Sequence, residues 1–160
     1  MVEIDHGFTT EMKYAIAGTF TGGLSSKGFR IMKQGTEDSW YNINTVYPVC
    51  PDKSEVEGGY KAYPTLKDLP EPVDVVIVVH KKELTTEIVQ EAATLDKRPS
   101  IWYMPGTQSE ESVAICEENN MKFASSCIMG HRLIPGWKRF FNFHNFHAKI
   151  AGMNRISKQE

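Results

Sequence analysis

A segment rich in glycine and hydroxyl side chains, 18-GTFTGGLSSK-27, is the part of the chain best suited to hold an anion. It follows a short apolar run that ends at Ala17, and it leads into residues with helical spacing. Glycines let the backbone approach a phosphate closely, and the N–H groups of a helix N-terminus carry partial positive charge. Thr19, Thr21 and Lys27 add hydrogen-bond donors and a cation. The segment predicts a phosphate-binding loop, with an ordinary flexible turn as the alternative.

Two common nucleotide-binding motifs do not fit this loop. Its glycines do not follow G-x-G-x-x-G, and the next expected strand ends in 48-PVCPDK-53 rather than in a lone acidic residue that would hold a ribose hydroxyl. The chain also lacks G-x-x-x-x-G-K-[ST]. The sequence therefore disfavours dinucleotide binding and gives no support to a P-loop nucleotidase.

The residues around the loop alternate between strand-like and helix-like patterns. Strands are expected at 13–17, 43–49, 73–80, 100–104 and 121–124, helices at 25–33, 83–95 and 109–119, and one helical turn at 66–69. The run 73-VDVVIVVH-80 is nearly all β-branched, which is typical of a strand covered on both faces of a parallel sheet. This order predicts an α/β fold, a Rossmann-like doubly wound sheet of about five parallel strands. Such sheets bind ligands at the carboxyl ends of the strands, where the strand order reverses.

Composition narrows the class of protein. The chain has 160 residues and a net charge of only -2, so it lacks the broad positive field of a nucleic-acid-binding protein. No apolar run approaches the roughly 20 residues of a membrane span, and residues 1–10 lack the pattern of a secretory signal. Cys50, Cys116 and Cys127 are odd in number and widely spaced, which favours reduced thiols. We therefore expect a cytoplasmic protein that binds neither nucleic acid nor membrane.

Several segments, in this order along the chain, resemble the small stand-alone CoA-binding domain proteins, which are related to the CoA-binding domain of the succinyl-CoA synthetase α subunit. The segments are 16-IAGTFTG-22, 46-VYPVCPDKSEVEGGYKAYPTLKDLP-70, 73-VDVVIVVHKKELTTEIVQEA-92, 102-WYMPG-106 and 127-CIM-129 followed by His131. The resemblance implies a CoA-binding Rossmann-like domain over residues 11–131, followed by a separate segment at 132–160.

The resemblance also implies coenzyme A as the ligand and assigns its contacts. The diphosphate is expected on the loop of Gly18, Thr19, Phe20, Thr21 and Gly22. The adenosine end is expected beside Cys50, Pro51 and Lys53, with Lys53 facing the 3′-phosphate, and the crevice is completed by His80, Lys81, Pro105 and Gly106. The family often has Asn, Gln and Arg where this chain has Cys50, Met104 and Ser126, so the contacts at these positions are expected to differ. Neither Gly18 nor Gly22 is expected to pack in the core, so valine at either position should block a phosphate and leave the fold intact.

The chemistry visible in the sequence is that of binding rather than of catalysis. No nucleophile–base pair stands out, and the phospho-histidine loop and ATP-grasp domain of the synthetase have no counterpart in these residues. The favoured interpretation is a non-catalytic carrier or sensor of CoA or acyl-CoA. One alternative is an enzyme that acts on a CoA thioester through His80, His131 or Cys127. Another is a redox regulator in which CoA forms a mixed disulfide with a cysteine.

The last segment is strongly aromatic. Trp137 and four phenylalanines occur within ten residues, in and just before 140-FFNFHNFHAKI-150. This pattern predicts a C-terminal helix whose apolar side mediates a homodimer. His144 and His147 have the spacing to share a metal ion, but no third ligand stands near them in the sequence, so no metal site is expected.

Overall fold

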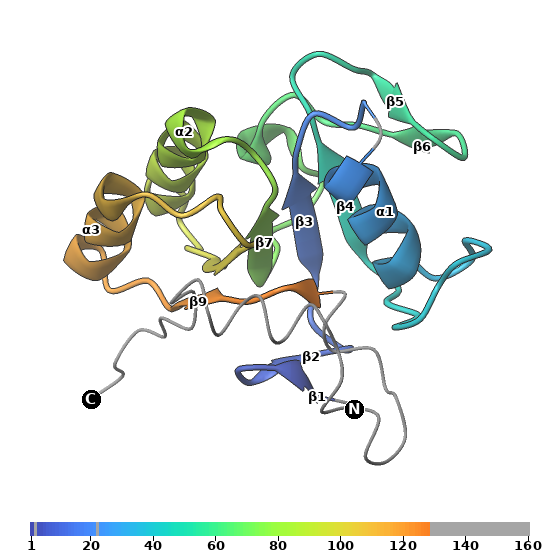
Figure 1. The fold of residues 1–160 in the computed structure, drawn as a ribbon, viewed down its shortest axis with the longest axis horizontal. Helices are drawn as coiled ribbons and strands as arrows, with labels where there is room; N and C mark the ends of the chain where they lie inside the picture. Colours follow the sequence, from blue (N-terminus) through green and yellow to red (C-terminus); the bar gives the residue numbers. More distant parts are fainter. Residues whose placement is uncertain (2, 22, 129–160) are drawn as a thin grey trace.

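A central five-stranded parallel sheet forms the middle of the molecule (Figure 1). The computed structural model describes residue 1, residues 3–21 and residues 23–128. The sheet has the order β4-β3-β7-β8-β9, with strands β3 (Tyr14–Ala17), β4 (Val46–Val49), β7 (Val75–Val78), β8 (Ser100–Tyr103) and β9 (Phe123–Ser125). All four neighbouring pairs are parallel. The predicted Rossmann-like fold and its five parallel strands are confirmed.

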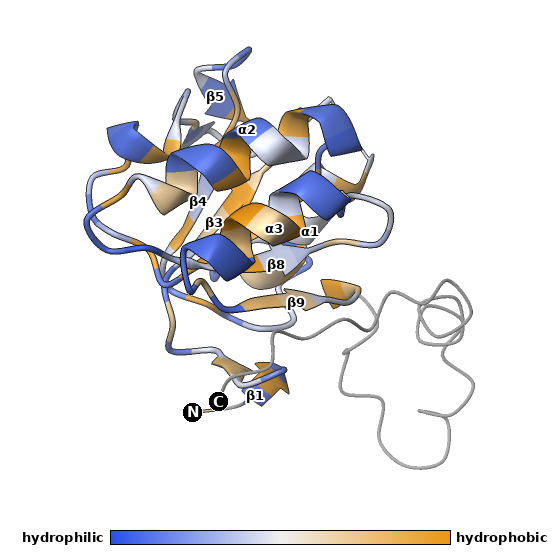
Figure 2. Cartoon of the chain, turned by 90° about the vertical axis from the view of Figure 1, so that its left-hand side faces the viewer, coloured by the Kyte–Doolittle hydropathy of each residue, from blue (hydrophilic) through white to orange (hydrophobic). Residues whose placement is uncertain are grey.

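Helices cover both faces of the sheet. Helix α1 (Gly23–Met32) lies on one face, and α2 (Lys82–Ala93) and α3 (Glu110–Glu118) lie on the other (Figure 1). The predicted turn at 66–69 is the 3₁₀ helix η1 (Leu66–Asp68), which packs against α2. Figure 2 shows mostly hydrophobic strands and helices that are part hydrophilic and part hydrophobic, as expected for helices with one side on a core.

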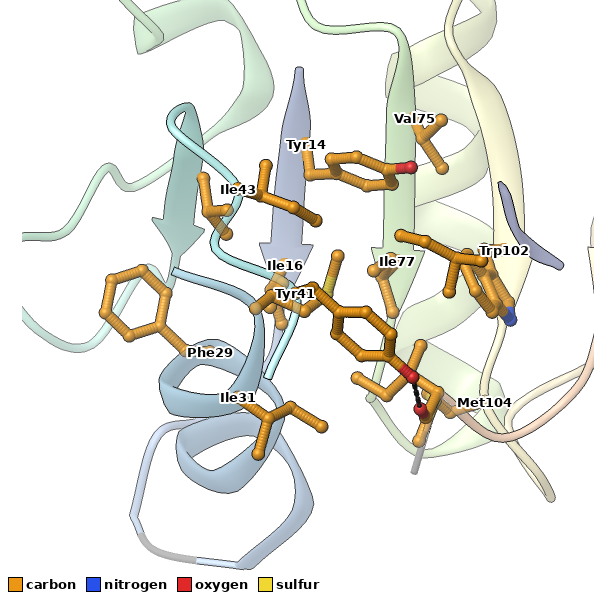
Figure 3. Packing of buried hydrophobic residues seen from close by; sticks show 14 of the residues in the cluster. Tyr14, Ile16, Phe29, Ile31, Tyr41, Ile43, Val75, Ile77, Trp102 and Met104 are labelled. Atoms are coloured by element: carbon orange, nitrogen blue, oxygen red, sulfur yellow. Dashed lines mark hydrogen bonds between the residues drawn. The ribbon is translucent and has the colours of Figure 1, made fainter. Parts of the chain in front are cut away.

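Two hydrophobic cores result from the alternation of side chains along the strands. On the α1 face, Tyr14, Ile16 and Ile77 pack with Phe29 of α1 and Trp102 of β8 (Figure 3). The opposite face carries smaller side chains such as Ala15, Ala17, Val76 and Val78, which pack against α2, α3 and η1. All residues of β3 and β7 are therefore buried, which explains the continuous apolar runs in their sequences.

The strand order reverses between β3 and β7. From β3 the chain passes through α1 to β4 on one side, and the later strands β7, β8 and β9 follow on the other side. Backbone hydrogen bonds continue past the strand ends, from Gly18 N–H to Val49 and from Val79 N–H to Ala17. The carboxyl ends of β4, β3 and β7 therefore lie side by side at one edge of the sheet.

A hairpin near the N-terminus covers part of the α1 face and was not predicted from the sequence. It consists of β1 (Glu3–Asp5) and β2 (Phe8–Thr9), which pair antiparallel. The ring of Phe8 stacks on Trp102 with centroids 5.1 Å apart, and the Ser126 hydroxyl donates a 2.7 Å hydrogen bond to Asp5. Residues before position 11 thus pack on the sheet. A second short hairpin, β5 (Glu55–Val56) with β6 (Tyr60–Lys61), was also missed.

The predicted C-terminal helix, its homodimer contact and the histidines at 131, 144 and 147 lie outside the described residues. Within the described ranges, no helix has the length and apolar character needed to cross a bilayer. The three cysteines are all buried and form no disulfide with one another.

Candidate ligand-binding site

The loop after β3 begins at a glycine that is packed more tightly than the sequence suggests. A Cβ atom on Gly18 would lie 2.5 Å from Cβ of Ser25, in the first turn of α1, and 3.6 Å from Cβ of Val79. Atoms this close overlap, so only glycine allows α1 to start this near to the sheet. The expectation that Gly18 does not pack is therefore wrong. Gly22 lies outside the described residues, so the same expectation stays a prediction there.

Phe20 shapes the loop rather than presenting its backbone to a ligand. Its φ angle is 49°, in the left-handed region, and its N–H donates a 3.1 Å hydrogen bond to Oγ of Ser25. The ring is buried and meets Phe29 edge to face, with centroids 6.2 Å apart. Because this N–H is already paired and the ring is buried, neither group is available to a ligand.

Thr19 and Thr21 form the accessible part of the loop. Both residues are exposed, and their hydroxyl oxygens lie 3.4 Å apart. No hydrogen bond from either N–H is found in the part of the chain that the structure describes. Two N–H groups without a partner among the described residues, and two hydroxyls that bond only to each other there, therefore lie on exposed residues just before the N-terminus of α1, a combination that suits a phosphate oxygen.

The segment after β4 is tied to this loop by two hydrogen bonds. The buried thiol of Cys50 donates to the carbonyl of Thr19 at 3.4 Å, and Nζ of Lys53 donates to the carbonyl of Phe20 at 2.8 Å. Lys53 is half-buried, while Pro51 and Asp52 are exposed. The structure thus brings Cys50, Lys53 and the loop together, and it places a cation beside the loop.

His80 lies two residues after the end of β7 and is 7% exposed. Its Nδ1 is buried without a hydrogen-bond partner among the described residues. Burial lowers the pKa of the imidazole, while the nearby carboxylate of Asp52 acts in the opposite direction. The next residue, Lys81, is exposed and is the N-cap of α2.

The segments after β8 and β9 contribute less to the edge. Pro105 is half-buried and Gly106 is exposed with a φ angle of 83°, and Thr107 closes the turn through its hydroxyl, which donates to Met104. Met104 itself is fully buried in the core on the α1 face. Ser126 bonds to the N-terminal hairpin, as described above. The side chains of Met104 and Ser126 therefore have packing roles in this chain.

Lys27 and two leucines complete the surroundings. Lys27 is exposed in the second turn of α1. Leu24 and Leu84, which are 44% and 42% exposed, lie in the first turns of α1 and α2. Apart from Met1, they are the large hydrophobic side chains left exposed in the described ranges. Sequence reasoning did not name either leucine as a site residue, whereas it expected the helix to begin near Ser25, close to the observed start of α1 at Gly23.

The described residues contain no group of three or more histidine, cysteine or acidic side chains placed to hold a metal ion. At this edge of the sheet they provide hydrogen-bond donors and the ammonium group of Lys53, next to the N-terminus of α1. Such an arrangement binds anions.

Comparison with known proteins identifies the family and the fold of this chain. The sequence profile of the CoA-binding domain family matches residues 13–132. A hypothetical protein from Pyrococcus horikoshii OT3 has a similar structure, with a TM-score of 0.61 and 24% identity over 81% of this chain and 93% of that one. A conserved hypothetical protein from Pyrococcus furiosus gives a TM-score of 0.61 and 25% identity, over 74% of this chain and 97% of that one. A Thermus thermophilus protein gives a TM-score of 0.58 and 20% identity, over 74% of this chain and 85% of that one.

The structural neighbours share the fold, and the family profile covers the sheet, both of its faces and the loops at its carboxyl edge. The resemblance found in the sequence motifs is confirmed. The chain therefore belongs to the CoA-binding domain family.

Proposed function

We propose that this protein binds CoA or an acyl-CoA at the carboxyl edge of β3, β4 and β7, and that it acts as a carrier or sensor without catalysing a reaction. The observation that carries the proposal is the exposed pair Thr19 and Thr21 at the start of α1, with Lys53 bonded to the same loop. Family membership supports CoA as the ligand. The resemblance of 16-IAGTFTG-22 to the family's first motif supports this loop as the place of the diphosphate.

In this proposal the diphosphate accepts hydrogen bonds from the N–H groups of Thr19 and Thr21 and from their hydroxyls. The N-terminus of α1 adds a partial positive charge. The adenosine end lies toward Cys50 and Pro51, and Pro105 and Gly106 flank the opposite side of the crevice. The exposed side chains of Leu24 and Leu84 offer apolar contact to the uncharged parts of the ligand, where their burial would be favourable.

The first test is a calorimetric titration of the reduced protein with CoA, dephospho-CoA and NAD in one buffer. We expect CoA to bind much more tightly than NAD, because NAD has no 3′-phosphate and the loop lacks the dinucleotide motif. Tight NAD binding or no CoA binding would overturn the proposed function.

Lys53→Ala is expected to weaken CoA binding by roughly ten- to a hundredfold, because a charge-assisted hydrogen bond to phosphate contributes about 1.5–3 kcal/mol. The loss with dephospho-CoA should be clearly smaller. Lys61→Ala is the matched control, since Lys61 is an exposed lysine on β6 that lies over the ring of Tyr63. Equal losses for both ligands in Lys53→Ala would place the 3′-phosphate elsewhere.

A redox role through a CoA mixed disulfide has less support from the structure. The fully buried thiol of Cys50 is engaged with Thr19, and burial raises the pKa of Cys116 to about 11. Thiols with raised pKa values react slowly, because the thiolate is the nucleophile. Turnover assays with short acyl-CoAs test the remaining alternative, an enzyme: hydrolysis or transfer with unmodified protein would replace the carrier proposal.

The proposal also includes the cytoplasm as the compartment, supported by the three free cysteines, and a homodimer through residues 132–160, supported by their aromatic composition. Light scattering measures the molecular mass in solution of the unmodified full chain and of Trp137→Ser. A dimer in the first and a monomer in the second is the expected result, and a monomeric full chain would contradict it.

A further inference from the structure

His80 carries a polar atom that the described residues leave without a partner. The side chain is more than nine-tenths buried, and its Nδ1 makes no hydrogen bond within the described ranges. A buried polar group without a partner costs free energy, on the order of 1–3 kcal/mol, so native proteins keep few of them. Such an atom at a candidate binding site indicates a contact that a ligand completes.

His80 stands at the same edge of the sheet as the loop after β3. His80 follows β7, and Asp52 follows β4; these two strands are the neighbours of β3 on either side. The Asp52 carboxylate is close enough to raise the pKa of His80. His80 and Asp52 therefore stand at the carboxyl edge of the sheet, after the two strands that flank β3 and the loop with Thr19.

The start of α2 adds unpaired donors at the same place. The N-cap residue Lys81 makes no side-chain capping bond, whereas α3 is closed by the Ser109 and Ser112 capping box. The first helical bonds of α2 are donated by Leu84 and Thr85 to the carbonyl of Lys81. The N–H groups of Lys82 and Glu83 come before these bonds. They lie at the N-terminus of a twelve-residue helix, where backbone N–H groups have no partner within the helix.

We propose that an oxygen of the ligand's diphosphate binds between the two helix starts, where it is held by Nδ1 of His80 and the first turn of α2, and that His80 takes up a proton when it binds. This inference rests on the proposed function, and it adds a second group of contacts to those of Thr19 and Thr21. It makes CoA affinity dependent on pH in the physiological range, which would allow the protein to respond to acidification.

The direction of the pH effect follows from the charges around the imidazole. In the free protein, burial keeps the pKa of His80 below its usual value, so the side chain is neutral at pH 7. The Asp52 carboxylate acts in the opposite direction and favours the charged imidazole. Lys81, Lys82 and Glu83 follow His80 in the chain and are exposed, and Lys53 is half-buried at the same edge of the sheet. A bound diphosphate adds negative charge and raises the pKa in the complex. Affinity should therefore increase as pH falls between the two pKa values, by up to about tenfold per pH unit for one proton.

The test uses dephospho-CoA rather than CoA. The 3′-phosphate of CoA titrates near pH 6, as phosphate monoesters do, and would add a proton change of its own. Titrations at pH 6, 7 and 8, in two buffers with different ionisation enthalpies and no phosphate, give both the affinity and the number of protons taken up. We expect proton uptake by the unmodified protein and tighter binding at pH 6 than at pH 8.

His80→Asn is the matched variant, because an amide retains hydrogen bonding near the place of Nδ1 but does not titrate. It is expected to bind dephospho-CoA without proton uptake and with little change from pH 8 to pH 6. The same proton uptake in both proteins, or none in the unmodified protein while binding stays tight, would overturn the inference and leave the proposed function intact. Absence of binding to both CoA and dephospho-CoA would overturn the proposed function itself.

A second measurement covers the case in which His80→Asn fails to fold. The imidazole signals of the unmodified protein are followed by NMR during pH titration, with and without dephospho-CoA. The His80 signal is assigned by comparison with single variants of the other four histidines. An upward shift of the His80 pKa on binding is the expected result, and an unchanged pKa would contradict the proposal.

Discussion

Gly18→Val is expected to destabilise the whole domain, at the upper end of the roughly 1–3 kcal/mol that overpacking costs. A Cβ at this position would overlap Cβ of Ser25, and the two further methyl groups of valine would enlarge the clash. Since Ser25 also accepts the hydrogen bond from Phe20, moving α1 away would open the loop as well. The midpoint of urea unfolding should fall, and CoA binding should be lost along with the loop.

Gly23→Ala is the control for this experiment. A Cβ on Gly23 meets nothing within 4 Å, so the only penalty comes from its φ angle of 73°. That strain costs roughly 1–2 kcal/mol for a residue other than glycine. If Gly18→Val unfolded at the same urea concentration as the unmodified protein, the close approach of α1 to the end of β3 would be wrong.

Phe8→Ala is expected to reduce the free energy of unfolding by about 3–5 kcal/mol, the usual cost of truncating a buried phenylalanine. The ring is 1% exposed and stacks on Trp102, which is itself fully buried. The variant therefore leaves a cavity and exposes one face of the indole. Urea unfolding of the full chain measures the change.

Phe8→Leu separates the two contributions of this ring. Leucine still fills most of the volume but cannot stack, so its cost should be clearly smaller than that of alanine. If Phe8→Ala left the unfolding midpoint unchanged, the N-terminal hairpin would not pack on the sheet in solution.

Much of the fold could be predicted because its strands are buried on both faces. The run that contains β7 is continuously apolar, so its assignment does not depend on an alternation of apolar and polar residues. The helices that follow it begin and end near the predicted residues. The two hairpins could not be predicted in this way. Their strands have only two or three residues, too short for a period. The hairpin of β1 and β2 is held by Trp102 and Ser126, which are far away in sequence.

The candidate site, like the fold, could be predicted only in part from the sequence. The order of strands and loops identified the edge of the sheet at which Thr19, Lys53 and His80 follow their strands. The pairing of Phe20 N–H with Ser25 and the tight packing of Gly18 depend on how closely α1 approaches β3, which no local pattern records. Cys50 and Ser126 depart from the family's pattern, and here they bond to Thr19 and Asp5 respectively. Their partners belong to other segments of the chain, so the sequence alone could not identify these roles.

The central place of β3 also sets the order in which the protein can assemble. Tyr14 pairs with Val46 on one side and with Val75 on the other, so the first strand of the sheet to be synthesised waits for two later ones. Pairings between distant segments slow folding, because the chain between them must be closed first. On the ribosome, the second neighbour of β3 becomes available only once β7 has emerged. A nascent chain that ends before this point would contain every residue of the loop but would lack one of the two strands that flank β3.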